Sequence, residues 1–173
     1  MTRLIILIGL PGSGKSSLAQ QLVAECHQRQ LISTDAIRAQ LFGDESVQGP
    51  WLRVRHQVQQ EFRQAVEKIL LGQVSEAIYD ATNAARKQRQ EAIALARACG
   101  FTHLTGLWVD TPIHLCLERN RQRPRQVPEE VILHMYRQLQ DAPPALDEGL
   151  DHLIHYSATS TESAIAPSRN NPT

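Results

Sequence analysis

The sequence predicts an α/β fold in which a parallel five-stranded sheet lies between two layers of helices. Strand-like apolar segments alternate with segments of helical spacing along most of the chain. The first of them, RLIILIG at residues 3–9, shows no polar alternation, as expected for a strand buried on both faces of a parallel sheet. A sheet of this kind binds its ligands at the carboxyl ends of the strands.

The remaining strands are expected where short apolar runs end in polar or turn residues. A glycine-rich loop follows the first strand and leads into a helix from Lys15 to about Arg29, with leucines at helical spacing. The later strands are predicted at residues 31–34, 74–80, 104–109 and, as a short fifth strand, 153–154.

The helices between these strands are placed by their start and stop residues. Asp35 begins a helix that stops at Gly43, and Pro50 suits the first turn of a long amphipathic helix that Gly72 ends. The last three helices are expected from about Thr82 to Cys99, from Asp110 to about Asn120, and from Pro128 onward with Val131, Met135 and Leu139 on one face.

The length and composition favour one domain. With 173 residues, of which 42% are apolar, the chain can build a single core, which we assign to residues 1–156. Residues 157–173 are rich in Ser, Thr, Asn and Pro and hold Ile165 as their one large apolar residue, so we expect a disordered tail. No apolar run is long enough to cross a membrane and the first ten residues are too short for a signal peptide, so we expect a soluble, cytoplasmic protein.

The cysteines and the net charge argue against a disulfide-rich protein, a zinc protein and a protein that binds long nucleic acids. Cys26, Cys99 and Cys116 are odd in number and far apart, so neither a disulfide framework nor a zinc site is indicated, and each is expected to be a small buried residue. Eighteen basic and eighteen acidic residues give a net charge of zero, which argues against a surface that binds long stretches of nucleic acid.

The strongest signal is GLPGSGKS at residues 9–16, which matches G-x-x-x-x-G-K-[ST], the Walker A phosphate loop. Glycines allow backbone N–H groups to surround phosphate oxygens, Lys15 would bridge the terminal phosphates, and the Ser16 hydroxyl would coordinate Mg²⁺. The alternative, a glycine turn that caps a helix, is disfavoured by the full spacing between a strand and a helix. The ATP-binding residues predicted here are Gly9, Pro11, Gly12, Ser13, Gly14, Lys15, Ser16 and Ser17.

Two acids stand where predicted strands end. Asp35, in STDAIR, could accept the proton of a substrate hydroxyl, and Arg38 one turn later could hold an anionic acceptor. Asp80, in YDATN, could face the nucleotide magnesium or orient an arginine. The alternatives are an ordinary helix cap for Asp35, a surface residue for Arg38 and a strand-end turn for Asp80.

The segment RNRQRPR at residues 119–125 contains four arginines in seven positions, with no acid between them. Because phosphoryl transfer spreads charge over the equatorial oxygens, a mobile loop carrying these arginines could stabilise that charge and exclude water. A merely soluble loop or an anion patch is the alternative. Two further groups of basic residues are expected on solvated helix faces, although either group could bind a polyanion. The first group is Arg53 and Arg55, and the second is Arg86, Lys87 and Arg89.

The order of these motifs resembles the P-loop kinases of the polynucleotide 5′-hydroxyl kinase type, to which zeta-toxin-like and seryl-tRNA kinases are related. The similarity is carried by GLPGSGKSS, STDAIR, YDATNAARKQR and RNRQRP followed by VPEEVILHMYRQL, which together cover about residues 3–140. It implies a three-layer P-loop NTPase fold, adenylate-kinase-like with a lid, and an ATP-binding domain of the AAA type is compatible with it.

The same resemblance implies specific roles. ATP with Mg²⁺ would be the donor, and the acceptor would be the 5′-hydroxyl end of a nucleic acid. Asp35 would be the general base, and Arg38, positioned by Asp80, would contact a neighbouring phosphate of the acceptor. Arg123, with Arg119, would act from the lid.

Two alternative functions remain open. Related folds phosphorylate small hydroxylated metabolites with the same loop, base and lid, so a sugar, a nucleotide-sugar or an antibiotic could be the acceptor. The second alternative is a non-catalytic ATP-binding module. The neutral charge and the single predicted domain weigh against a nucleic-acid acceptor.

Overall fold

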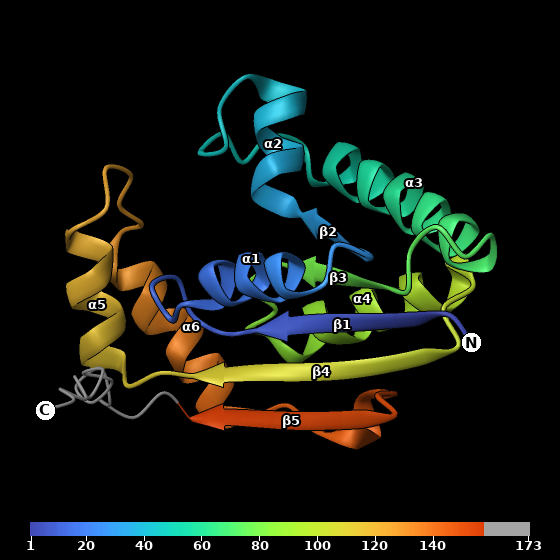
Figure 1. Cartoon of the computed structure of the whole chain (residues 1–173). Helices are drawn as coiled ribbons and strands as arrows, with labels where there is room; N and C mark the ends of the chain where they lie inside the picture. The colour runs from blue at the N-terminus through green and yellow to red at the C-terminus, as the bar shows by residue number, and fades with distance from the viewer. Residues whose placement is uncertain (158–173) are drawn as a thin grey trace, which may run out of the picture.

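The computed structural model describes residues 1–157, which form a five-stranded parallel sheet with helices on both faces (Figure 1). The strand order is β2-β3-β1-β4-β5, and every neighbouring pair is parallel. The predicted α/β fold is therefore confirmed. The tail expected after residue 156 lies outside the described residues, except for Ser157, which ends the last strand.

The strands and helices alternate as predicted, with an additional short 3₁₀ helix near the end. The strands are β1 (Arg3–Ile8), β2 (Arg29–Ser33), β3 (Glu76–Asp80), β4 (His103–Asp110) and β5 (His152–Ser157). The helices are α1 (Lys15–Glu25), α2 (Thr34–Phe42), α3 (Trp51–Leu70), α4 (Arg86–Cys99), α5 (Ile113–Arg121), α6 (Glu129–Asp141) and the 3₁₀ helix η1 (Leu146–Glu148).

Several element boundaries differ from the prediction, and contacts explain the difference at the end of α1. Helix α1 ends at Glu25 rather than near Arg29, because Arg29 is the first residue of β2. Its guanidinium pairs with Glu76 at the start of β3, at 2.6 Å, and donates to the Leu22 carbonyl oxygen. Strand β5 has six residues instead of two.

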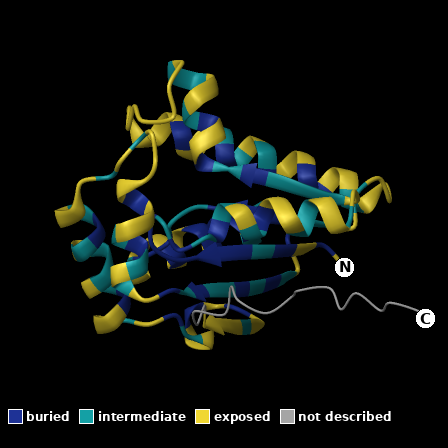
Figure 2. Cartoon of the chain, turned by 60° about the vertical axis from the view of Figure 1, so that its left-hand side comes forward, coloured by how far each residue is buried: buried dark blue, intermediate teal, exposed yellow. Residues whose placement is uncertain are grey.

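The sheet separates two apolar layers. On one face, Leu7 and Ile78 pack against Ala19 of α1. On the other, helices α3, α4, α5 and α6 cover a larger core, in which the Phe62 ring meets Tyr79 and Phe101 edge to face at 5.1 and 5.6 Å. Burial is highest along the central strands, whereas the loops after α2 and α5 are mostly exposed (Figure 2).

The buried guanidinium of Arg89 joins three segments of the chain. Its side chain is 1% exposed, so the expectation of a solvated helix face is wrong for this residue. Arg89 forms a bidentate ion pair with Glu148 of η1 and donates to the carbonyl oxygens of Ala84 and Ala142. The sequence shows a run of basic residues on this helix, but not that Arg89 is the one that pairs with Glu148, 59 residues later.

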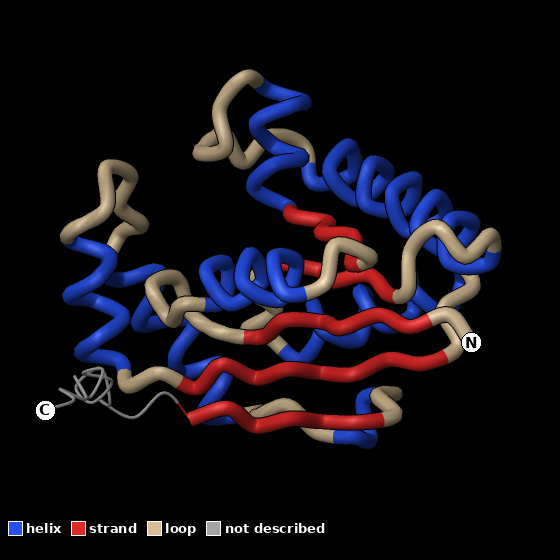
Figure 3. Tube along the Cα trace, viewed as in Figure 1, coloured by secondary structure: helices blue, strands red, loops and turns tan. Residues whose placement is uncertain are grey.

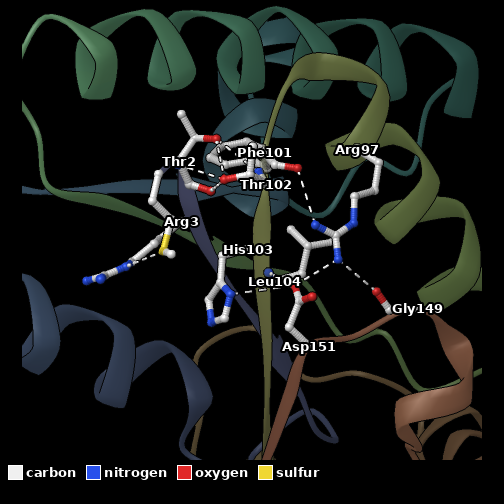
Figure 4. A network of polar contacts seen from close by, with 10 residues as sticks. Thr2, Arg3, Arg97, Phe101, Thr102, His103, Leu104, Gly149 and Asp151 are labelled. Carbon is white, nitrogen blue, oxygen red and sulfur yellow. Dashed lines mark hydrogen bonds and ion pairs between the residues drawn. The ribbon is translucent and has the colours of Figure 1, made fainter.

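The amino ends of the strands are joined by a separate polar network (Figure 4). The Thr2 hydroxyl donates to the Gly100 carbonyl oxygen at 2.6 Å, and the Asp151 carboxylate accepts from Arg97 and from the Leu104 backbone N–H. These bonds connect β1, β4, the start of β5 and the end of α4. The carboxyl ends of the strands lie at the opposite edge, where the glycine-rich loop and the loop after α5 gather (Figure 3).

Other composition-based expectations have mixed outcomes. Cys116 is buried as predicted, whereas Cys26 and Cys99 are only half-buried. Within residues 1–157, no helix has both the length and the apolar character that a membrane crossing requires.

We expect Glu148→Gln to destabilise the protein strongly, because it leaves the Arg89 charge buried without its partner. Breaking a buried ion pair costs about 3–5 kcal/mol. The free energy of unfolding, measured by urea denaturation, should fall by this amount. Asp147→Asn is the matched control, since it breaks the neighbouring exposed pair with Arg86, worth about 0–1 kcal/mol. Equal losses in the two variants would contradict the role of Arg89.

Candidate active site

The loop between β1 and α1 has the backbone shape of a phosphate cradle. Gly12 and Gly14 have φ values of 79° and 96°, in the left-handed region that favours glycine. A Cβ on Gly12 would lie 2.5 Å from the Cys116 carbonyl oxygen, so this position excludes any side chain. No side chain caps the first turn of α1, which leaves its N–H groups available to an anion.

Lys15 is buried beside this loop with few partners. Its side chain is 8% exposed, and its ammonium donates one hydrogen bond, to the Leu10 carbonyl oxygen at 3.3 Å. Burial lowers the pKa of Lys15, while the nearby carboxylates of Asp80 and Asp35 oppose this shift. A buried ammonium with a single carbonyl partner among the described residues fits a site that receives phosphate oxygens.

The hydroxyls of the loop complete this part of the site. Ser16 and Ser17 face the cavity described below, while the buried Ser13 hydroxyl has no partner among the described residues. In residues 1–157, no group of three or more His, Cys, Asp or Glu side chains could hold a metal. A magnesium ion here would therefore need the phosphates and water beside the Ser16 hydroxyl, which is its usual environment in nucleotide sites.

The two strand-end acids lie at the carboxyl edge of the sheet, where both line one cavity. The pairing of Ser33 with Asp80 aligns the ends of β2 and β3, so that Asp35, in the first turn of α2, comes near Asp80. Asp80 is 7% exposed. The Arg38 guanidinium donates to the Asp35 carboxylate at 3.2 Å, and its buried Nε has no partner among the described residues.

Asn83 is a site-supporting residue that the sequence analysis did not identify. It has φ 51°, a left-handed conformation that asparagine tolerates better than most residues, and its amide donates to the Leu7 carbonyl oxygen at 2.8 Å. The Gly9 N–H donates to the neighbouring Thr82 carbonyl oxygen at 3.0 Å. These two bonds hold the end of β3 against the base of the glycine-rich loop.

The arginine-rich segment extends from α5 over this edge. Arg119 donates to the Gly12 carbonyl oxygen at 3.5 Å. Asn120, which the sequence analysis also missed, closes the segment by exchanging two hydrogen bonds with the Val127 backbone, at 2.8 and 2.9 Å. Among the described residues, Arg119 and Arg123 have no carboxylate partner.

No acid stands within this segment, yet two of its arginines pair with acids elsewhere in the chain. Arg121 pairs with Glu129 at 2.6 Å, and Arg125 pairs with Glu45 at 3.3 Å. Both acids lie outside the arginine-rich run, so no alternation of charge reveals them. The pair between Arg125 and Glu45 connects the loop after α5 with the loop after α2.

One cavity of about 1270 Å³ brings the predicted site residues together. Gly9 and Ser13 of the glycine-rich loop are the exceptions and do not line the cavity. The predicted residues that line it are Pro11, Gly12, Gly14, Lys15, Ser16, Ser17, Asp35, Arg38, Asp80, Arg119 and Arg123.

The cavity carries an excess of positive charge although the chain is neutral. Seven cationic side chains line it against four carboxylates. Such a concentration of one sign attracts anionic ligands. The cations are Lys15, Arg38, Arg55, Lys87, Arg119, Arg123 and Arg125, and the carboxylates are Asp35, Glu45, Asp80 and Glu91.

Comparison with known proteins gives consistent matches. Residues 4–142 match the family model described as an AAA domain. The L-seryl-tRNA(Sec) kinase of Methanococcus maripaludis is 27% identical over 137 residues, which cover 77% of this chain and 51% of that protein. The chain thus spans about half the length of this curated relative.

Two solved structures show the same fold. One, titled as the Pnkp1/Rnl/Hen1 RNA repair complex, has a TM-score of 0.65 at 23% identity, covering 81% of this chain and 44% of that chain. The other, described as a sugar kinase from Janibacter sp. HTCC2649, has a TM-score of 0.58 at 19% identity, covering 91% of this chain and 86% of that chain. At these identities the similarity concerns the fold alone.

We expect ATP affinity to fall in the alkaline range. Burial holds the pKa of Lys15 below its usual 10.5, and phosphate oxygens beside it would raise that pKa again. The complex then binds more protons than the free protein, so the dissociation constant rises as pH increases through the lowered pKa. Calorimetric titration with Mg·ATP between pH 7.5 and 10 measures this.

Lys15→Arg is the control for this titration, because a guanidinium stays charged throughout that range. Any ATP binding that it retains should not weaken with pH. A constant affinity of the wild-type protein up to pH 10 would contradict the role of Lys15.

Proposed function

The chain belongs to the AAA domain family, and from this membership and its cavity we propose that it is an ATP-dependent kinase acting on the 5′-hydroxyl end of a nucleic acid. The observation that carries the kinase assignment is the position of Asp35 and Arg38. They line the same cavity as Lys15 and Arg123, so a hydroxyl acceptor and the terminal phosphate of ATP can be bound together.

The donor half is assigned to the glycine-rich loop. The backbone N–H groups of Gly12 and of residues 14–17, together with the Lys15 ammonium, would hold the phosphates. Ser16 would be the protein ligand of magnesium. Magnesium, when bound, would neutralise charge on the phosphates. Arg123 and Arg119 would stabilise the charge that develops on the transferred group.

The acceptor half is assigned to α2. In the proposed reaction the acceptor hydroxyl gives its proton to the Asp35 carboxylate while its oxygen bonds to the γ-phosphorus. The bond from that phosphorus to the oxygen bridging it to the β-phosphate breaks, and ADP leaves. Arg38, with its Nε free of partners among the described residues, would hold a phosphate of the acceptor next to the hydroxyl.

Two observations support a nucleic-acid acceptor. The cavity holds more cationic side chains than ATP alone would engage. The similarity to a seryl-tRNA(Sec) kinase is consistent with an acceptor group carried on a nucleic acid. The competing proposal, a small-molecule kinase, is supported by the fold shared with a sugar kinase and by the apolar inner wall formed by Val58, Phe62 and Leu95.

Incubation with γ-labelled ATP and a panel of acceptors tests this proposal. The panel comprises 5′-hydroxyl DNA, 5′-hydroxyl RNA and small hydroxylated metabolites, and we expect label on an oligonucleotide. Label on a small metabolite alone would establish the competing proposal. ATP binding without transfer to any acceptor would identify a non-catalytic module.

We expect Asp35→Asn to lower the transfer rate by about 10²–10⁴-fold, because the acceptor hydroxyl loses its proton acceptor. Binding of ATP should be nearly unchanged, since the glycine-rich loop remains intact. Initial rates of transfer and calorimetric ATP titration measure the two effects. Asp44→Asn serves as the control, because this acid lies on the loop after α2 outside the cavity. Transfer by Asp35→Asn at the wild-type rate would exclude Asp35 as the base.

A further inference from the structure

Apart from Arg125, which pairs with Glu45, the proposed donor and acceptor groups leave two cavity cations without a function. Lys15, Arg119 and Arg123 are assigned to ATP, and Arg38 to the acceptor phosphate nearest the hydroxyl. Arg55 of α3 and Lys87 of α4 also line the cavity. In the part of the chain that the structure describes, neither side chain forms an ion pair.

An exposed aromatic ring lies on the same helix face as Arg55. Trp51 is 47% exposed and lines the cavity, and it stands four residues before Arg55 on α3, so the two side chains are neighbours on one face. The same face continues with the buried side chains of Val58 and Phe62. This wall of the cavity is therefore apolar at depth and becomes aromatic and cationic toward the beginning of α3.

Helix α4 forms the adjoining wall with a similar gradient. Lys87 stands in its first turn, and Ala92 and Leu95 follow deeper in the helix. Glu91 is one turn from Lys87, but the two side chains do not pair. Helices α3 and α4 pack against each other, so Arg55 and Lys87 belong to adjoining walls.

An exposed aromatic ring beside unpaired cations is the combination that binds single-stranded nucleic acid. Bases stack on the ring whatever their sequence, and the cations contact the backbone phosphates. A neutral sugar would engage neither cation.

We propose that Trp51, Arg55 and Lys87 form a subsite for the second nucleotide of a single-stranded acceptor. Its base stacks on Trp51, and its 3′-phosphate lies between Arg55 and Lys87. The inference rests on the proposed function, because Arg38 and Asp35 must hold the first nucleotide. A base that stacks on Trp51 is unpaired, so the subsite also favours single-stranded ends over duplex ends.

The length dependence of the acceptor tests this subsite. Transfer from labelled ATP is measured to a nucleoside 3′-phosphate and to a six-nucleotide single strand, both with a 5′-hydroxyl. The readout is the ratio of kcat/KM for the hexamer to kcat/KM for the nucleoside 3′-phosphate. The double variant Arg55→Ala/Lys87→Ala should lower this ratio by about ten-fold, as expected for the loss of charge-assisted hydrogen bonds to one phosphate.

Further variants distinguish the loss of phosphate contacts from the loss of base stacking and from the loss of any positive charge on α3. Trp51→Ala should lower the ratio by about ten-fold through lost stacking, and Trp51→Phe should largely retain it. Arg53→Ala is the matched control, because it removes a cation of α3 that lies over the Phe42 ring, outside the cavity. Thermal melting of each variant verifies that it is folded.

The outcomes separate this inference from the proposed function. A wild-type ratio in the double variant, or an equal fall in Arg53→Ala, overturns the subsite while the kinase proposal stands. Wild-type protein that labels neither acceptor overturns the nucleic-acid proposal and the subsite with it.

Discussion

The geometry of the cavity depends on the short connection between β3 and α4. Arg89 donates a hydrogen bond to the Ala84 carbonyl oxygen of this connection, and the buried ion pair with Glu148 holds the Arg89 guanidinium in place. In the same connection, Asn83 is bonded to β1 through the Leu7 carbonyl oxygen. Because Asp80 ends β3 and the glycine-rich loop begins at the end of β1, these contacts fix the acid relative to the loop. Burying the Arg89 charge costs desolvation free energy. Its several directional hydrogen bonds, however, restrict the backbone of the connection.

The distribution of charge explains how a neutral chain could serve a polyanionic substrate. Eighteen cations and eighteen acids cancel over the whole sequence, yet the cavity lining retains an excess of cations. Acids outnumber cations in the rest of the sequence, by fourteen to eleven, and this balances the excess. Net charge governs long-range attraction, whereas the lining governs recognition. The zero net charge of the chain therefore does not argue against a cavity that binds the end of a nucleic acid.

Local signals were sufficient to predict the elements and the glycine-rich loop, because strand burial, glycine spacing and helix stops depend on neighbouring residues. The boundary of α1, by contrast, is set by the contact of Arg29 with Glu76, far along the chain. The same reason hides the buried state of Arg89 and the pairing of Arg125 with Glu45. Asn83 carries a local signal in its tolerance of a left-handed backbone, but its bond to Leu7 arises only when β1 and β3 pair.

The central claim is that the glycine-rich loop is the donor half of a transfer site and does not serve hydrolysis. The direct measurement is the fate of the γ-phosphate in a single turnover with labelled ATP, with and without a 5′-hydroxyl oligonucleotide. We predict that most of the label appears on the oligonucleotide, and that free phosphate forms only slowly when the acceptor is absent. Release of free phosphate at one rate in both conditions, with no label on the oligonucleotide, would contradict the account.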